Sequence, residues 1–183
     1  MGQLDDILRI ASSELPAGGV ECLLIGGFAV NYYGYTRNTV DVDFMIVSED
    51  IENVKTILRA AGFTDSDVRE NVAFFNKPEG GPRVDFLRID RGTMAKLSSR
   101  AVPVSIHGHP LRIPALPDLI AMKIFAFAQS PERRLGKDLP DIAYLSVLNH
   151  LDFDADIRPL CDKFGSPRVC AMIREQMEGL RSS

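Results

Sequence analysis

The stretch Thr39-Val40-Asp41-Val42-Asp43-Phe44-Met45-Ile46 alternates apolar and acidic side chains up to Phe44 and then continues with apolar residues. Alternate side chains of a β-strand share one face of the sheet, so this pattern predicts a strand over residues 39–47. Asp41 and Asp43 are expected to point together to one face. The apolar set is expected to point to the other face, toward a core, and consists of Val40, Val42, Phe44 and Ile46.

Two carboxylates at this spacing repel each other, and burial would make their charges more costly. A bound divalent cation would remove the repulsion. Carboxylate oxygens suit Mg²⁺, which commonly takes one or two of them together with phosphate oxygens. The alternative is a solvated sheet edge that carries two acids, and a bare Asp-x-Asp motif does not decide between the two interpretations.

A glycine pair, Gly26-Gly27, lies upstream between an apolar run and a short helical pattern. Glycine lets the backbone approach a ligand closely, and the first turn of a helix offers free N–H groups to an anion. The segment is neither a GxxxxGK[ST] loop nor a GxGxxG loop. A tight strand-to-helix turn is the alternative interpretation.

Hydrophobic patterns elsewhere indicate strands and helices as far as residue 114 and helices beyond it. The expected strands cover residues 20–25, 39–47, 72–76, 83–89, 102–106 and 111–113. The expected helices cover residues 4–11, 28–33, 51–61, 117–128 and 137–148, with one or two more after residue 154. We therefore expect an α+β fold, with residues 1–114 forming the core and residues 115–183 forming a helical C-terminal part packed on it.

Composition fits a soluble globular protein, with 45% hydrophobic residues, 25% charged residues and a net charge of -4 over 183 residues. An acidic chain is not built mainly to coat nucleic acid. Cys22, Cys161 and Cys170 form no CxxC pair, so we expect reduced thiols and a cytoplasmic location. We expect no signal peptide and no membrane span, because neither pattern is present.

Three segments together resemble the signature of the nucleotidyltransferase superfamily, which has the DNA polymerase β-like fold. They are Gly26-Gly27-Phe28-Ala29-Val30, Arg37-Asn38-Thr39 and Asp41-Val42-Asp43. The match is specific over residues 25–46 and looser over residues 83–86 and 116–145. It is strongest to the small bacterial branch that includes the AbiEii-type abortive-infection toxins. The resemblance implies a nucleotidyltransferase-like mixed sheet flanked by helices.

The resemblance also implies a third carboxylate on a later strand. Asp85 is the candidate, inside the otherwise apolar strand Val84-Asp85-Phe86-Leu87, and Asp90 is a weaker rival because it falls after that run. Asp41, Asp43 and Asp85 would then be both the catalytic residues and the ligands of a two-metal Mg²⁺ site, with a nucleoside triphosphate (NTP) as substrate. A strand-end acid facing water is the alternative for Asp85.

Seven further residues are candidate nucleotide contacts: Gly26, Gly27, Arg37, Thr39, Lys123, Lys137 and Asp138. Arg37 suits bidentate phosphate binding, or it is an exposed loop arginine. Lys123 lies in an apolar helix, where a lysine commonly extends its charged end to water, but similar toxins carry a lysine there that faces the triphosphate. Lys137-Asp138 matches an Arg-x-x-Lys-Asp pattern of related toxins, or simply opens a helix.

The function implied is Mg²⁺-dependent transfer of a nucleoside monophosphate from an NTP to a hydroxyl acceptor. The acceptor would be an RNA end (tRNA included), a protein or a small molecule such as an antibiotic, and the chain would be the toxin of a pair with a cognate antitoxin. Two alternatives stay open. One is a nucleotide-binding module without turnover, and the other is an unrelated α/β protein.

Overall fold

The structure is a computed structural model that describes residues 2–182. The chain forms two compact units. The first comprises the residues as far as Ala29 together with Asn38–Ala115. The second comprises Val30–Arg37 together with the residues from Leu116 onward. Residues 30–37 therefore belong with the C-terminal helices, although segments of the first unit precede and follow them.

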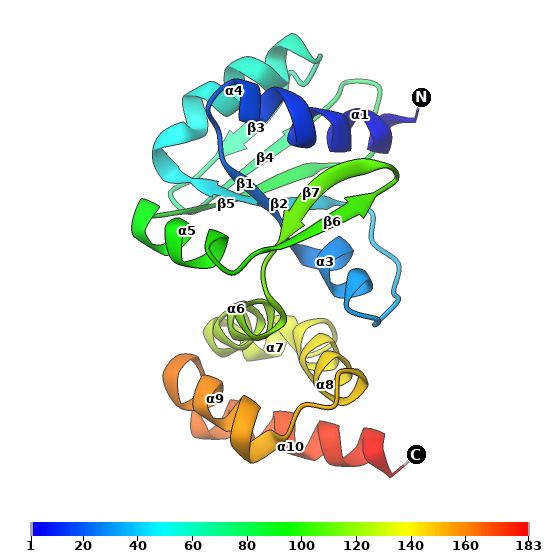
Figure 1. Ribbon diagram of the computed structural model, residues 1–183, viewed down its shortest axis with the longest axis vertical. Coiled ribbons are helices and arrows are strands. Elements are labelled where there is room, and N and C mark those ends of the chain that lie inside the picture. The colour runs from blue at the N-terminus through cyan, green and yellow to red at the C-terminus, as the bar shows by residue number, and fades with distance from the viewer. Residues whose placement is uncertain (1, 183) are drawn as a thin grey trace. The chain divides into compact units, whose positions relative to one another are not determined.

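A five-stranded sheet forms the centre of the first unit, in the order β1-β2-β5-β4-β3 (Figure 1). The strands are β1 (Cys22–Leu24), β2 (Val42–Val47), β3 (Asp65–Val68), β4 (Val72–Asn76) and β5 (Val84–Ile89). β2 and β5 run parallel, and the other neighbouring pairs are antiparallel. The predicted mixed sheet is therefore present.

Aromatic packing holds the middle of this sheet together. The rings of Phe44 on β2 and Phe86 on β5 stack with centroids 5.7 Å apart. Phe75 on β4 meets Phe86 edge-on at 5.7 Å. All three side chains are buried, so they form one apolar row across three neighbouring strands.

Helices flank the sheet, as predicted. α1 and α4 lie over one face and α5 lies over the other (Figure 1). A separate hairpin of β6 and β7 contacts β1. The bounds are α1 (Gln3–Arg9), a π-helix (Ile10–Glu14), α2 (Leu15–Ala17), a 3-10 turn (Ser48–Asp50), α4 (Ile51–Ala60), α5 (Arg91–Ser98), β6 (Val102–Ile106) and β7 (His109–Ile113). α3 (Gly26–Tyr32) begins in the first unit and ends in the second.

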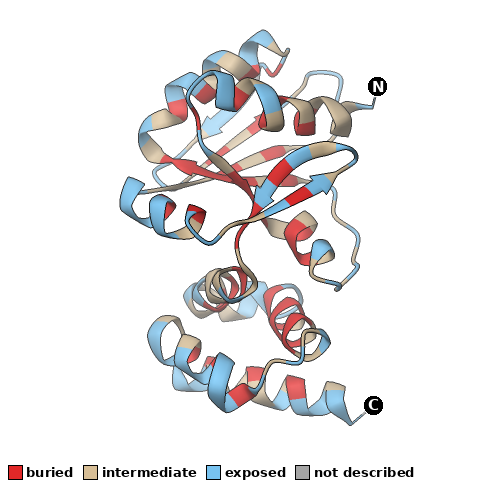
Figure 2. Ribbon diagram, in the orientation of Figure 1, coloured by how far each residue is buried: buried red, intermediate tan, exposed pale blue. Residues whose placement is uncertain are grey.

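The second unit is helical. Its elements are α6 (Leu116–Gln129), α7 (Pro131–Arg134), α8 (Asp138–Leu148), a π-helix (Phe153–Ile157), α9 (Arg158–Phe164) and α10 (Pro167–Arg181). Buried apolar residues lie where α6, α8 and α10 face one another, and Figure 2 marks them in red. Residues 30–37 join this unit because Tyr35 stacks on Tyr144 at 4.3 Å and the Asn149 amide donates to the Tyr33 carbonyl at 3.0 Å.

The structure corrects the prediction for the strand that carries the acids. β2 begins at Val42, so Thr39 and Asp41 lie in the preceding loop. Val40, expected to face the core, is 75% exposed. The reason is that strand pairing starts only where Val42 donates its N–H to the Arg83 carbonyl, at 2.9 Å. The alternating pattern thus extends beyond the strand, because the residues before Val42 have no neighbouring strand to pair with.

β3 and α5 were not predicted, and neither were the short elements α2, the 3-10 turn and α7. β3 is polar, and it exists because β4 offers it a pairing edge. α5 contains Gly92 and Thr93 near its start, both weak helix formers, but the Asp90 carboxylate caps it by accepting from the Thr93 N–H at 2.9 Å. Among residues 2–182, no helix combines the length and the apolar character needed to span a membrane.

We expect Phe86→Ala to destabilise the protein by about 3–5 kcal/mol, because it removes the ring at the centre of the aromatic row. Val40→Ala is the matched control, since it also truncates an apolar side chain, but an exposed one, and should change stability by less than about 0.5 kcal/mol. Denaturant unfolding of the two variants measures both values. Equal effects would contradict the placement of Val40 outside the core.

Candidate active site

Two of the predicted carboxylates are brought together by the parallel pairing of the central strands. Asp43 on β2 and Asp85 on β5 are register partners. Asp41 lies directly before β2, and its side chain is about as exposed as that of Arg83. The Asp85 side chain is 15% exposed. Strand pairing therefore fixes an acid cluster in the first unit, composed of Asp41, Asp43 and Asp85.

Arg83 supplies the positive charge for this acid cluster. Its Nε and Nη2 atoms donate to the two carboxylate oxygens of Asp85, each at 2.6 Å. Nη2 also donates to Asp41 Oδ2 at 3.2 Å. One guanidinium thus spans two of the three acids, and its bidentate geometry on Asp85 is the strongest form of this contact.

The surroundings hold the Arg83 guanidinium in its charged form. The pKa of Arg83 is raised, chiefly by its hydrogen bonds to Asp85, and also by the charges of Asp85, Asp41 and Asp43, while partial burial acts in the opposite direction. The guanidinium also lies 4.8 Å from the centre of the Phe74 ring. Phe74 is the register partner of Asp85 on β4, so the same strand pairing places the ring beside the ion pair.

The predicted glycine pair packs closely against Asp43 of the acid cluster and against Thr39. Gly26 has a φ of +62°, and a Cβ at this position would lie 2.0 Å from Asp43 Oδ2. A Cβ on Gly27 would lie 2.4 Å from Thr39 Oγ1. The Ile25 N–H donates to the Asp43 carbonyl at 2.8 Å, which fixes the turn against β2. Glycine is therefore required at both positions by close packing against Asp43 and Thr39.

The second unit contains a different charged cluster, built around Lys123 on α6. Its ammonium donates to Asp138 Oδ1 at 2.9 Å and to Asp141 Oδ2 at 2.6 Å. The side chains of Asp138 and Asp141 are 1% and 0% exposed. Lys123 does not extend to water, and it neutralises two buried carboxylates of α8.

Two arginines complete this buried ion-pair network. Arg37 donates from Nε and Nη2 to both oxygens of Asp141, at 2.7 and 3.0 Å. Arg134 donates to Asp138 Oδ2 at 2.6 Å. Burial acts to raise the pKa of Asp138, but Lys123 and Arg134 outweigh it, so this pKa is lowered overall.

Sequence reasoning did not assign a role to Asp141 or to Arg83. Asp141 follows Asp138 by one helical turn, a spacing that places both on one helix face, and this signal was available from the sequence. Arg83 precedes Asp85 by two residues in the strand predicted over residues 83–89, which also predicts a shared face. Asp90, the rival third acid, caps α5 and is not part of the acid cluster.

The predicted site residues therefore fall into two groups. Those in the first unit are Gly26, Gly27, Thr39, Asp41, Asp43 and Asp85, and those in the second are Arg37, Lys123, Lys137 and Asp138. Lys137 is exposed at the start of α8. The catalytic, metal-binding and nucleotide-binding roles assigned to both groups stay predictions.

The chemistry of the acid cluster fits a divalent cation, because all three side chains offer hard oxygen ligands. As the side chains stand, no three acidic, histidine or cysteine residues within the described chain form a group ready to hold a metal ion. The Arg83 guanidinium already binds two of the three acids. The carboxylate oxygens are thus suitable ligands for a divalent cation, and the Arg83 guanidinium supplies the positive charge that compensates two of the acids.

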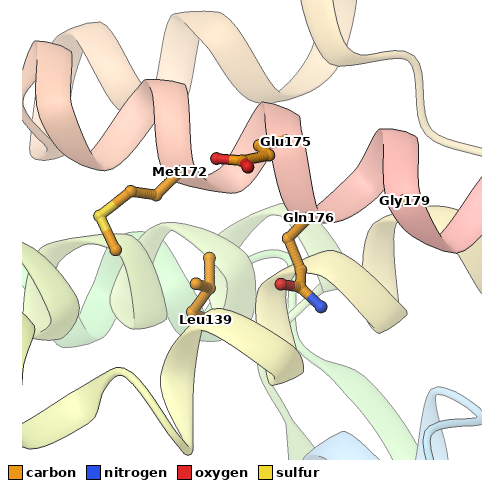
Figure 3. Close-up of a pocket in the computed structure, with 5 residues that line it drawn as sticks. All are labelled: Leu139, Met172, Glu175, Gln176 and Gly179. Carbon is orange, nitrogen blue, oxygen red and sulfur yellow. The ribbon is translucent and has the colours of Figure 1, made fainter.

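A pocket of about 400 Å³ lies in the second unit between α8 and α10 (Figure 3). It is lined by Leu139, Met172, Glu175, Gln176 and Gly179. In Figure 3 the Met172 and Gln176 side chains extend toward α8, where Leu139 lies. None of the predicted site residues lines this pocket.

Three solved structures with a similar fold are described as nucleotidyltransferase-like or adenylyl-transferring proteins. An antigenic nucleotidyltransferase-like protein from Paracoccidioides brasiliensis aligns with a TM-score of 0.56 and 17% identity, over 94% of this chain and 92% of the other. ANT(2″)-Ia in complex with adenylyl-2″-tobramycin aligns with a TM-score of 0.60 and 13% identity, over 98% and 99%. The lincosamide antibiotic adenylyltransferase LnuA aligns with a TM-score of 0.54 and 15% identity, over 79% and 95%.

Fold and acid cluster together define a protein of the nucleotidyltransferase class. The family model described as "Nucleotidyl transferase AbiEii toxin, Type IV TA system" matches residues 11–175. The chain belongs to this AbiEii nucleotidyltransferase family, as its motifs had indicated. No curated protein matches it significantly.

We expect Gly26→Ala to displace the Asp43 carboxylate and to weaken any ligand bound by the acid cluster, in addition to a backbone cost of about 1–2 kcal/mol at positive φ. Gly19→Ala is the matched control, because Gly19 has a φ of +76° and open space where a Cβ would be. Thermal unfolding and Mn²⁺ binding measure the two effects. If both variants lose stability equally and bind Mn²⁺ equally, the close approach to Asp43 is not functional.

We expect Lys123→Met to destabilise the protein by about 3–5 kcal/mol at neutral pH, because two buried carboxylates lose their shared cation. The loss should shrink as the pH falls through the lowered pKa of Asp138, since the protonated acid no longer needs that cation. Denaturant unfolding at pH 7 and at successively lower pH values measures this trend. Lys163→Met is the control, since Lys163 is exposed. A small, pH-independent effect at Lys123 would contradict the network.

Proposed function

We propose that this protein transfers a nucleoside monophosphate from a magnesium-bound NTP to a hydroxyl acceptor. The observation that carries this proposal is the register pairing of Asp43 with Asp85, next to Asp41 and in front of the Gly26-Gly27 turn. Three carboxylates beside a closely packed glycine turn are suited to holding a metal–triphosphate complex. Membership of the AbiEii family supports the same reaction class.

Asp41, Asp43 and Asp85 would hold the Mg²⁺ ions. Bound there, Mg²⁺ supplies charge neutralisation of the triphosphate and of the attacking and leaving oxygens. The protein contributes mainly position and charge. The family resemblance implies that Asp85 also helps to accept the proton of the acceptor hydroxyl, which would require Arg83 to release one of its oxygens. The glycine turn would hold Asp43 and Thr39 in place for the metal–triphosphate complex, because both side chains pack against its backbone.

The acceptor and the biological role are further parts of the proposal. We propose that the chain is the toxin of a pair with a cognate antitoxin, because its family is described as a toxin of type IV pairs. It would act in the cytoplasm on an RNA end or a protein hydroxyl. ANT(2″)-Ia and LnuA are antibiotic-modifying enzymes, so a drug hydroxyl is the alternative acceptor that a transfer assay must include. Arg37, Lys123, Lys137 and Asp138 are the proposed nucleotide contacts of the second unit.

Calorimetry with each of the four NTPs and Mg²⁺ tests the nucleotide site. We expect Mg²⁺-dependent binding to the native protein and a loss of at least about tenfold in affinity in Asp41→Asn/Asp43→Asn, because the metal ligands are weakened. Asp67→Asn is the control, since it removes an exposed acid of β3 in the same unit. No binding by the native protein would contradict the proposal, as would equal binding by the double variant.

Transfer must be separated from binding. An NTP labelled at its α-phosphate should pass the label to the acceptor in the native protein, and Asp85→Asn should abolish that transfer. A module that only binds nucleotide would give no transfer in either protein, and binding would survive the loss of Asp85. RNA, protein and aminoglycoside acceptors are assayed in parallel.

A further inference from the structure

The position of Arg83 has a consequence for how the acid cluster accepts a metal ion. Both oxygens of Asp85 and one oxygen of Asp41 receive hydrogen bonds from this guanidinium. These oxygens are the ones that a divalent cation would need. A metal ion on Asp41 and Asp85 would also face the Arg83 charge at close range, and like charges so near each other repel strongly.

The Arg83 guanidinium can nevertheless move away from the carboxylates. Its side chain is 41% exposed, and Asp41 is exposed to 42%, so the ion pair lies at the surface of the first unit. Outside the acid cluster, its side-chain contact is with the face of the Phe74 ring, which does not fix the guanidinium by hydrogen bonds. Its backbone stays anchored because the Arg83 carbonyl accepts from the Val42 N–H. The head group can therefore exchange partners while the strand stays in place.

We infer that Arg83 is an exchangeable counter-cation of the acid cluster: it compensates the carboxylates when no divalent cation is bound, and it competes with that cation for them. This inference rests on the proposed function, since it concerns the same carboxylates. It adds that metal binding requires the release of a specific arginine. The protein would thus keep a stable acid cluster without metal, at the cost of lower intrinsic metal affinity.

Mn²⁺ binding without nucleotide tests the inference directly, with free Mn²⁺ measured by electron paramagnetic resonance. We expect Arg83→Gln to bind Mn²⁺ about tenfold more tightly than the native protein, because the competing charge is gone. Arg83→Lys keeps the charge but loses the bidentate fork, so its affinity should fall between the two. Arg59→Gln removes an exposed arginine of the same unit and should match the native affinity, which excludes a simple effect of net charge.

Thermal unfolding adds a second measurement. Without metal, Arg83→Gln should melt below the native protein, because Asp41 and Asp85 lose the cation that binds them, and Mn²⁺ should restore the melting temperature. Adding Mn²⁺ should raise the melting temperature of the native protein by less than it raises that of Arg83→Gln. An arginine with only a structural role would lower the melting temperature without this rescue. If Arg83→Gln does not fold, both measurements are made on Arg83→Lys.

Equal or weaker Mn²⁺ binding by the Arg83 variants would overturn the inference, as would the absence of rescue by Mn²⁺. Neither result would contradict the proposed function if the native protein still binds an NTP with Mg²⁺. Conversely, the proposed function would be contradicted if the native protein bound no NTP with Mg²⁺. Tighter Mn²⁺ binding by Arg83→Gln would then still show that Arg83 competes for the carboxylates.

Discussion

Mutual repulsion among Asp41, Asp43 and Asp85 is the constraint around which the first unit is built. Parallel pairing of β2 with β5 places two of these acids side by side, and the chain entering β2 adds the third. Such an arrangement is stable only if positive charge reaches the carboxylates. Arg83 provides it from the position directly before β5, the strand that carries Asp85. The aromatic row of Phe44, Phe86 and Phe75 then fixes the strands, so the carboxylates of Asp43 and Asp85 have little freedom to separate.

The second unit meets a related constraint in a more buried setting. Asp138 and Asp141 are almost fully enclosed, and three cations from α6, α7 and residues 30–37 bind them. Removing one cation from such a network leaves a buried charge without a partner, which is the costly case. The network also explains why residues 30–37 belong to this unit, because Arg37 is tied to α8 by two hydrogen bonds.

Local patterns predicted the glycine turn and the acid-bearing strands β2 and β5, because an acid inside a short apolar run stands out from the core around it. The prediction that Val40 faces the core was wrong, because the alternating pattern continues into residues that have no partner strand. Charge partners were only partly accessible to local patterns. The two-residue spacing of Arg83 and Asp85 predicts a shared face, but the two acidic partners of Lys123 are 15 and 18 residues away. Such pairings depend on strand register and helix packing, which exist only once the chain has folded.

An acid cluster that carries its own cation also separates folding from metal binding. Small metal-dependent domains gain their folding free energy from the metal, and they unfold when it is removed. Here the guanidinium of Arg83 already satisfies two of the acids, so the strands that carry the site do not depend on an external cation to form. If a divalent cation binds the acid cluster as we propose, its binding free energy would be reduced by the free energy of releasing Arg83. The stability of the acid cluster and its affinity for metal would then be opposed through this one side chain.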